Sequence, residues 1–316
     1  MIAYERTDIR QKLLTGGNCR LANVRSKFGI ELFIPKFNYD NLEKFELIGL
    51  TKWLLIQRNE RKPEDFRELG CAQCIHGESL GFDFSMAFQP IVDLRKGQIF
   101  AQEALARGLS GESAGTVFEQ VDEHNLYRFD QTCRVKAIEL ASRFPSTSLI
   151  SINFMPRAVY RPELCIRTTL AAAKEYSVDV SRIMFEVTEG EKVDDSSHLQ
   201  SIINYYKSQG FKTAIDDFGA GFSGLNMLAE FLPDLVKLDM ALIRNIHSSR
   251  SRKAIVKGVA TMCHELDIGL IAEGIETVEE KETLLELGIY LQQGYLYSKP
   301  VFERFANEAE ISEFKK

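Results

Sequence analysis

The sequence predicts an α/β fold in which parallel strands close into a barrel, preceded by a small N-terminal appendage. From residue 82 onward, short β-branched and apolar segments alternate with amphipathic segments of helical period. Strands that are separated by single helices pair in parallel through crossovers. Seven or eight such strands in about 230 residues indicate a closed barrel rather than an open sheet.

Composition and charge restrict the function classes. The 316 residues are 45% hydrophobic and 27% charged, which is ordinary for a globular protein. A formal net charge of -6 argues against binding to duplex nucleic acid, because that affinity comes from Lys and Arg. An acidic protein can still bind a small phosphate ester through divalent cations. Charges in the first ten residues and the lack of a long apolar run predict a cytoplasmic protein without membrane segments.

Residues 1–70 differ from the remainder and form a segment of unknown fold. A strand is expected over 29–37 and a helix over 41–61. We expect this appendage either to pack against the barrel or to have a regulatory role, with an unknown protein as its partner. Residues 71–81 form a linker that contains Cys71 and Cys74 in a CxxC pattern.

The CxxC pattern has two interpretations. Together with His76 and Cys19 it could hold zinc, but a complete second half of the usual ligand pattern is missing. A pair of reduced linker thiols is therefore favoured.

The barrel region, residues 82–314, begins with a hairpin and continues in strand and helix units. The hairpin strands are expected over 85–94 and 98–105, around a turn at 95–97. Further strands are expected at 148–154, 182–189, 211–217, 234–239 and 268–274, and around residue 293. Helices are expected over 114–124, 126–143, 161–176, 194–209, 222–230, 250–266, 277–287 and 302–312.

Two adjacent carboxylates, Asp216 and Asp217, end the strand that begins at residue 211, before a glycine-rich turn. Taken alone, such a pair is more often a helix cap next to a solvated acid. Other strand ends reverse that preference, since parallel strands of a barrel all end at one face. Oxygen-bearing side chains lie at these ends: Glu103, Asn153, Glu186, Asp216, Asp217 and Glu273. All-oxygen ligands favour Mg²⁺ or Mn²⁺, and six of them suggest two ions that act on a phosphoryl group.

Two basic residues accompany these acids. Lys237 is interpreted equally as a buried counter-ion and as a group that orients the attacking water. Arg107 could bind a phosphate oxygen through its forked donors, although its position alone favours a surface arginine.

The region from about Phe82 to Phe314 resembles the EAL-type cyclic di-GMP phosphodiesterases of bacteria. The ordered motifs that carry the resemblance are FQPIVDL, EAL at residue 103, SINF, FEVTE, DDFGAG, VKLD, AEGIET and QGYLYSKP. The resemblance implies a modified (β/α)₈ TIM-like barrel with one antiparallel strand, consistent with the hairpin at 85–105. It implies hydrolysis of cyclic di-GMP to linear pGpG.

The resemblance also assigns roles to residues. It implies that the metal ligands are Glu103, Asn153, Glu186, Asp216 and Asp217. Lys237 and Glu273 match positions that engage the catalytic water, with Glu273 as general base, and Arg107 and Gln293 match substrate-site positions. Glu189 matches the residue that steadies the DFGAGFSG loop, which contributes to dimer contacts in the family. This loop reads GAGFSGLNML, where the commonest form is nearer GTGYSSLSYL.

Two other functions compete with the enzyme. The chain could be a catalytically silent receptor for the dinucleotide, or a partner-binding regulator whose barrel is a scaffold. Retention of every ligand position favours the enzyme.

Overall fold

The structure is a computed structural model that describes residues 22–25, 31–34, 80–159, 161–188, 196–221 and 224–311. The chain divides into two units, Met1–Glu68 and Leu69–Lys316. In the first unit, β1 (Ala22–Arg25) pairs antiparallel with β2 (Glu31–Ile34), so β2 lies within the strand expected at 29–37. The helix expected over 41–61 and the CxxC linker lie outside the described residues.

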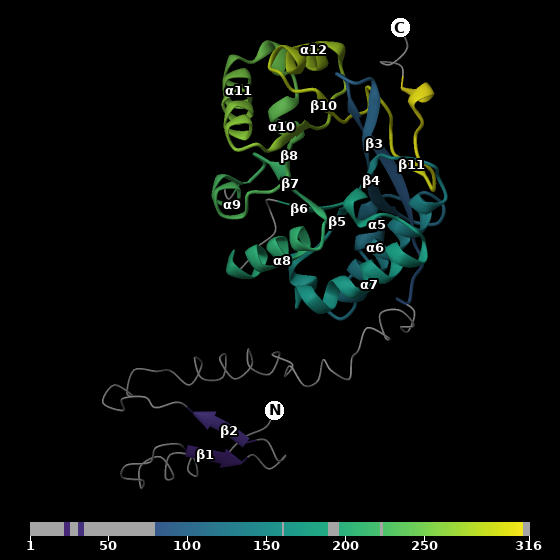
Figure 1. The fold of residues 1–316 in the computed structure, drawn as a ribbon, viewed down its shortest axis with the longest axis vertical. Coiled ribbons are helices and arrows are strands. Elements are labelled where there is room, and N and C mark those ends of the chain that lie inside the picture. The colour runs from purple at the N-terminus through teal and green to yellow at the C-terminus, as the bar shows by residue number, and fades with distance from the viewer. Residues whose placement is uncertain are drawn as a thin grey trace, which may run out of the picture. The chain divides into compact units, whose positions relative to one another are not determined.

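In the second unit, eight strands close into a barrel (Figure 1). The strands are β3 (Ser85–Asp93), β4 (Gln98–Arg107), β5 (Leu149–Asn153), β6 (Ile183–Thr188), β7 (Lys212–Phe218), β8 (Leu235–Leu238), β9 (Gly269–Ala272) and β10 (Leu291–Gln292). Neighbours from β4 to β10 pair in parallel. β3 runs antiparallel to both β4 and β10 and closes the ring. The predicted barrel with one antiparallel strand is therefore confirmed.

The hairpin of β3 and β4 follows from its turn residues. Asp93 accepts hydrogen bonds from the backbone N–H groups of Arg95 and Lys96, at 3.0 and 3.2 Å. Gly97 has a φ of 63° and donates its N–H to the Asp93 carbonyl at 2.9 Å. Glycine adopts that conformation without the steric cost that a Cβ adds, so it favours a tight reversal.

Helices connect the strands and cover the outside of the barrel. They are α5 (Ala114–Phe118), α6 (Leu126–Ser142), α7 (Pro162–Glu175), α8 (Ser196–Ser208), α9 (Gly224–Phe231), α10 (Met240–Ile243), α11 (Arg250–Glu265) and α12 (Val278–Glu286). Short 3₁₀ turns lie at Pro156–Ala158, Val180–Arg182, Ile246–Ser248 and Glu308–Glu310. No helix among the described residues combines the length and apolar character needed to span a bilayer.

Two apolar clusters hold the barrel. The larger lies between the strands and the helices that cover them. The smaller fills the barrel interior and contains Ile91, Ala101, Met184, Ala214, Leu235 and Ile271. Their side chains close the barrel below the ends of the parallel strands, so polar groups inside the barrel gather towards those ends. We call that end the mouth.

Two predicted helices are wrong in part or in full. The helix predicted over 114–124 ends at Phe118, because the Asp122 side chain accepts the N–H groups of His124 and Asn125 and holds the following residues in turns. The helix predicted over 302–312 is replaced by β11 (Val301–Phe302), which pairs with β3, and by a 3₁₀ turn. Phe305 packs edge-on against Phe88, with ring centroids 4.9 Å apart, so tertiary contacts override the local helical pattern.

Candidate metal centre

The predicted acids meet towards the mouth, most of them because they lie on inward-facing strand positions. Glu103 lies in β4, opposite Ser151 of β5, and Asn153 of β5 lies opposite Glu186 of β6. Neighbours in register on parallel strands point to the same face, so all four side chains face the interior. Glu273 directly follows β9 and Gln293 directly follows β10.

Lys237 of β8 lies at the centre of the acids and is 1% exposed. Its Nζ lies 2.6 Å from Glu273 Oε1, 2.8 Å from Glu186 Oε2 and 2.9 Å from Asp216 Oδ1. Glu103 Oε2 lies further away, at 3.7 Å. One ammonium group thus neutralises only part of the surrounding negative charge.

Two amide side chains hold Glu103 in place. Asn153 Nδ2 donates to Glu103 Oε1 at 3.1 Å, and Gln293 Nε2 donates to Glu103 Oε2 at 2.8 Å. Gln293 is 3% exposed, and its Oε1 has no hydrogen-bond donor among the described residues. A buried acceptor of this kind is suited to a donor group on a ligand.

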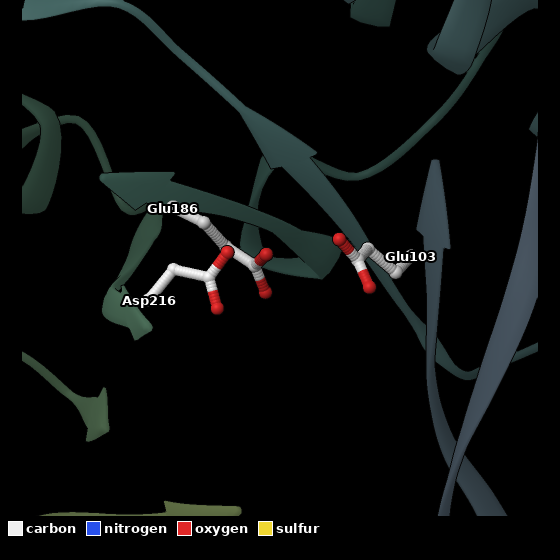
Figure 2. Close-up of side chains that lie close together, drawn as sticks. All are labelled: Glu103, Glu186 and Asp216. Atoms are coloured by element: carbon white, nitrogen blue, oxygen red, sulfur yellow. The ribbon is translucent and has the colours of Figure 1, made fainter. Parts of the chain in front are cut away.

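The carboxylates form two overlapping groups, each with ligand atoms within 4.8 Å of one another. Glu103, Glu186 and Asp216 form the first group, and Figure 2 shows their three carboxylates turned towards one another. Asp216, Asp217 and Glu273 form the second group. Asp216 belongs to both groups.

A backbone irregularity brings Asp216 and Asp217 to the same site. Alternation along β7 puts Ala214 and Asp216 inside the barrel and would put Asp217 outside. The pairing of β7 with β8 is irregular between Ile215 and Phe218, and Asp217 has a φ of 54°. Asp tolerates this left-handed conformation better than most residues. The bulge therefore turns the second carboxylate back towards the first.

Burial and mutual repulsion change the ionisation of these groups. Burial, together with nearby Glu103 and Asp216, raises the pKa of Glu186 to about 8 despite Lys237. Burial and Asp216 raise the pKa of Asp217 to about 6.

Lys237 and Glu273 also titrate abnormally. Burial raises the pKa of Glu273 well above its usual value, against the effect of Lys237. Burial alone would lower the pKa of Lys237, but the surrounding carboxylates, Asp216 foremost, raise it well above its ordinary value. The lysine therefore stays charged while the acids compete for protons or cations.

Of the other predicted site residues, Arg107 makes no ion pair with these acids among the described residues. Arg107 ends β4 on the same strand face as Glu103, and its Nη1 donates to the Ala106 carbonyl at 2.7 Å. Glu189 lies outside the described residues. The structure also places a residue in the cluster that we did not predict: Ser151, which hydrogen-bonds Glu186. The spacing of Ser151 and Asn153 by two residues in a strand was the available signal.

The protein is thus a mostly parallel barrel whose acidic side chains surround one lysine towards the ends of the strands. The chain belongs to the EAL domain family, whose sequence model matches residues 79–300. The resemblance drawn from the motifs is thereby confirmed.

Solved structures of the family have the same fold. A standalone versatile EAL protein from Vibrio cholerae O395, in its c-di-GMP-bound form, is 54% identical with a TM-score of 0.71; the match covers 72% of this chain and 97% of that one. A manganese and cy-diGMP complex of BlrP1 from Klebsiella pneumoniae is 34% identical with a TM-score of 0.67, covering 70% of this chain and 56% of that one.

Curated relatives have both enzymatic and regulatory names. The blue light- and temperature-regulated antirepressor BluF of Escherichia coli K12 is 28% identical over 94% of this chain and 72% of its own length. PdeG of the same organism, described as a probable cyclic di-GMP phosphodiesterase, is 28% identical over 87% of this chain and 52% of its own length. The chain thus spans about half the length of PdeG.

Proposed function

We propose that this chain is a metal-dependent phosphodiesterase that hydrolyses cyclic di-GMP to linear pGpG. The observation that carries the proposal is the pair of carboxylate groups that share Asp216. Five carboxylates and the Lys237 ammonium leave a formal charge of −4, which two divalent cations balance. The oxygen donor set suits Mg²⁺ or Mn²⁺.

Glu103, Asn153, Glu186, Asp216 and Asp217 would hold the ions. When bound, a binuclear centre supplies an activated water and neutralises charge on the phosphodiester. Glu273 is our candidate for the general base, since its carboxylate groups with Asp216 and Asp217 and its pKa is raised. Lys237, 2.6 Å from Glu273, would orient the attacking water and steady developing negative charge.

Arg107 and Gln293 are our candidates for substrate contacts. Arg107 follows Glu103 by four residues on β4, so its guanidinium extends from the same face nearer the mouth. Gln293 lies beside Glu103 with a buried Oε1 that has no hydrogen-bond donor in the described part of the chain. The pair would bind the dinucleotide from two strands.

The wider organisation of the chain remains part of the proposal. We assign residues 82–314 to the phosphodiesterase domain, 71–81 to a linker, and 1–70 to a regulatory or packing segment that could bind a protein partner. We further propose a cytoplasmic homodimer in which Glu189 steadies the loop after β7.

The proposal is tested with the purified full chain, cyclic di-GMP and Mn²⁺, by measuring pGpG. Glu103→Ala and Asp216→Ala should each lower turnover more than roughly 100-fold, since loss of a mere supporting partner already costs up to that factor. Thermal unfolding should show both variants folded. Unchanged turnover in either variant would contradict the metal assignment.

The similarity to the antirepressor BluF, which extends over 94% of this chain, favours a regulator as the second candidate. The same assay separates the alternatives. Tight binding of cyclic di-GMP without pGpG formation would indicate a silent receptor. Failure to bind the dinucleotide at all would indicate a partner-binding regulator.

A further inference from the structure

Ser151 lies inside the barrel, directly beneath the acidic cluster. It is fully buried in β5, where it pairs in register with Glu103 of β4 and Met184 of β6. Asn153, two residues later, pairs with Glu186. Ser151 therefore faces the interior one layer deeper than Glu186, next to the apolar interior cluster to which Met184 belongs.

The two oxygens of Glu186 have different donors. Ser151 Oγ donates a hydrogen bond to Oε1 from below. Lys237 Nζ lies 2.8 Å from Oε2. A carboxylate held at both oxygens by groups on two different strands cannot rotate freely, so its plane is fixed.

The two donors differ in how firmly they fix that plane. Lys237 has a long, flexible stem, and its ammonium group also contacts Asp216 and Glu273. Ser151 has a single side-chain torsion on a backbone that is paired on both sides. The serine therefore defines the orientation of Glu186 more strictly than the lysine does.

We propose that Ser151 is a positioning residue that aims the Glu186 carboxylate at the cation site formed with Glu103 and Asp216. The inference rests on the proposed function. Without the hydroxyl, Oε1 would have no side-chain donor among the described residues, and the carboxylate would rotate towards Lys237. The three carboxylates would then no longer present oxygens to a common point.

The test measures Mn²⁺ binding to the full chain by isothermal titration calorimetry, without substrate. Ser151→Ala should weaken binding about 10- to 100-fold, the usual cost of losing a partner that orients a metal ligand. The matched control is Ser148→Ala, just before β5, whose Oγ hydrogen-bonds Ser146 Oγ at 2.8 Å. The Mn²⁺ affinity of Ser148→Ala should equal that of wild type. Equal affinity of Ser151→Ala and wild type would overturn the inference.

A second pair of variants separates the hydroxyl from the volume of the side chain. Thr and Val have nearly the same shape, but only Thr keeps the donor. Ser151→Thr should bind Mn²⁺ at least 10-fold more tightly than Ser151→Val, and both should unfold at similar temperatures. Equal affinities in this pair would contradict a role for the hydroxyl.

The outcomes also separate this inference from the proposed function. If wild type binds Mn²⁺ and Glu103→Ala does not, the metal centre is supported whatever Ser151→Ala does. If wild type itself binds no Mn²⁺, the proposed function fails, and the inference fails with it.

Discussion

Two buried cations, Lys237 inside the barrel and Arg134 outside it, are surrounded in opposite ways. Arg134 of α6 is 0% exposed and pairs with one carboxylate, Asp130, at 2.7 Å. Its Nη1 donates to Tyr206 Oη at 2.8 Å, and its guanidinium lies 5.0 Å from the ring centroid of Phe185. Lys237 instead faces four carboxylates.

A buried charge that supports the fold is thus distinguishable from one that serves a binding site. Around Arg134, one positive charge meets one negative charge and aromatic faces, so the environment is balanced. Around Lys237, the negative charge exceeds what the lysine supplies. A surplus of buried charge is costly unless another species compensates it, and this indicates a site that binds a cation.

The largest effect is expected from breaking the balanced pair. Arg134→Met should lower the free energy of unfolding by about 3–5 kcal/mol, because Asp130 is left buried without its counter-ion. Chemical denaturation measures the loss. The control is the double variant Asp130→Leu with Arg134→Met, which should recover much of it. If the double variant is no more stable than Arg134→Met alone, the loss does not come from leaving Asp130 without its counter-ion.

A smaller and conditional effect is expected for Lys237→Met. Without metal, the remaining carboxylates repel one another, and the variant should lose about 3 kcal/mol. Mn²⁺ at a hundred times its Kd should return about 2.7 kcal/mol. The measurement is thermal unfolding of wild type, Lys237→Met and Arg134→Met with and without Mn²⁺. Mn²⁺ also stabilises wild type and Arg134→Met, so the difference in stability between those two should not change. The difference between Lys237→Met and wild type should narrow, because acids without their ammonium group bind the cation more tightly. If Mn²⁺ raises the unfolding temperatures of Lys237→Met, Arg134→Met and wild type equally, the two buried cations do not differ as described.

The smallest effect concerns Glu280 of α12, a buried acid that is satisfied by the backbone. Burial alone would raise its pKa, but the N–H groups of Glu276, Asn245 and Thr277 lower it below 4.5. A folded-state pKa below the unfolded value gives stability that is present above pH 4.5 and lost as the pH falls through the folded-state pKa. Glu280→Gln should therefore cost about 1–2 kcal/mol at pH 7.

The difference in free energy of unfolding between Glu280→Gln and wild type should become smaller at acidic pH. Urea denaturation at pH 7 and at pH 3 measures both values. A gap that stays constant across this range would show that the carboxylate charge contributes nothing.

Much of the barrel follows from local sequence patterns. The turn residues at 95–97 predicted the hairpin, and apolar segments predicted the parallel strands. The helix predicted over 302–312 was wrong, because β11 pairs with β3, and a local pattern does not contain such a long-range contact. The grouping of acids at strand ends was predictable from topology. The place of Lys237 among the acids agrees with one of its two interpretations, the buried counter-ion. The contact of Ser151 with Glu186 was not predictable, because it depends on side-chain directions on neighbouring strands.

The kink at Asp217 has a consequence for protein engineering. In a regular strand, two inward carboxylates need a spacing of two residues, so grafting an Asp-Asp pair onto an unkinked barrel strand would aim one acid at the outer helices. Here the backbone conformation at φ 54°, rather than residue identity alone, delivers both acids to one point. A designer who copies this centre must transplant the irregular β7 backbone along with its side chains.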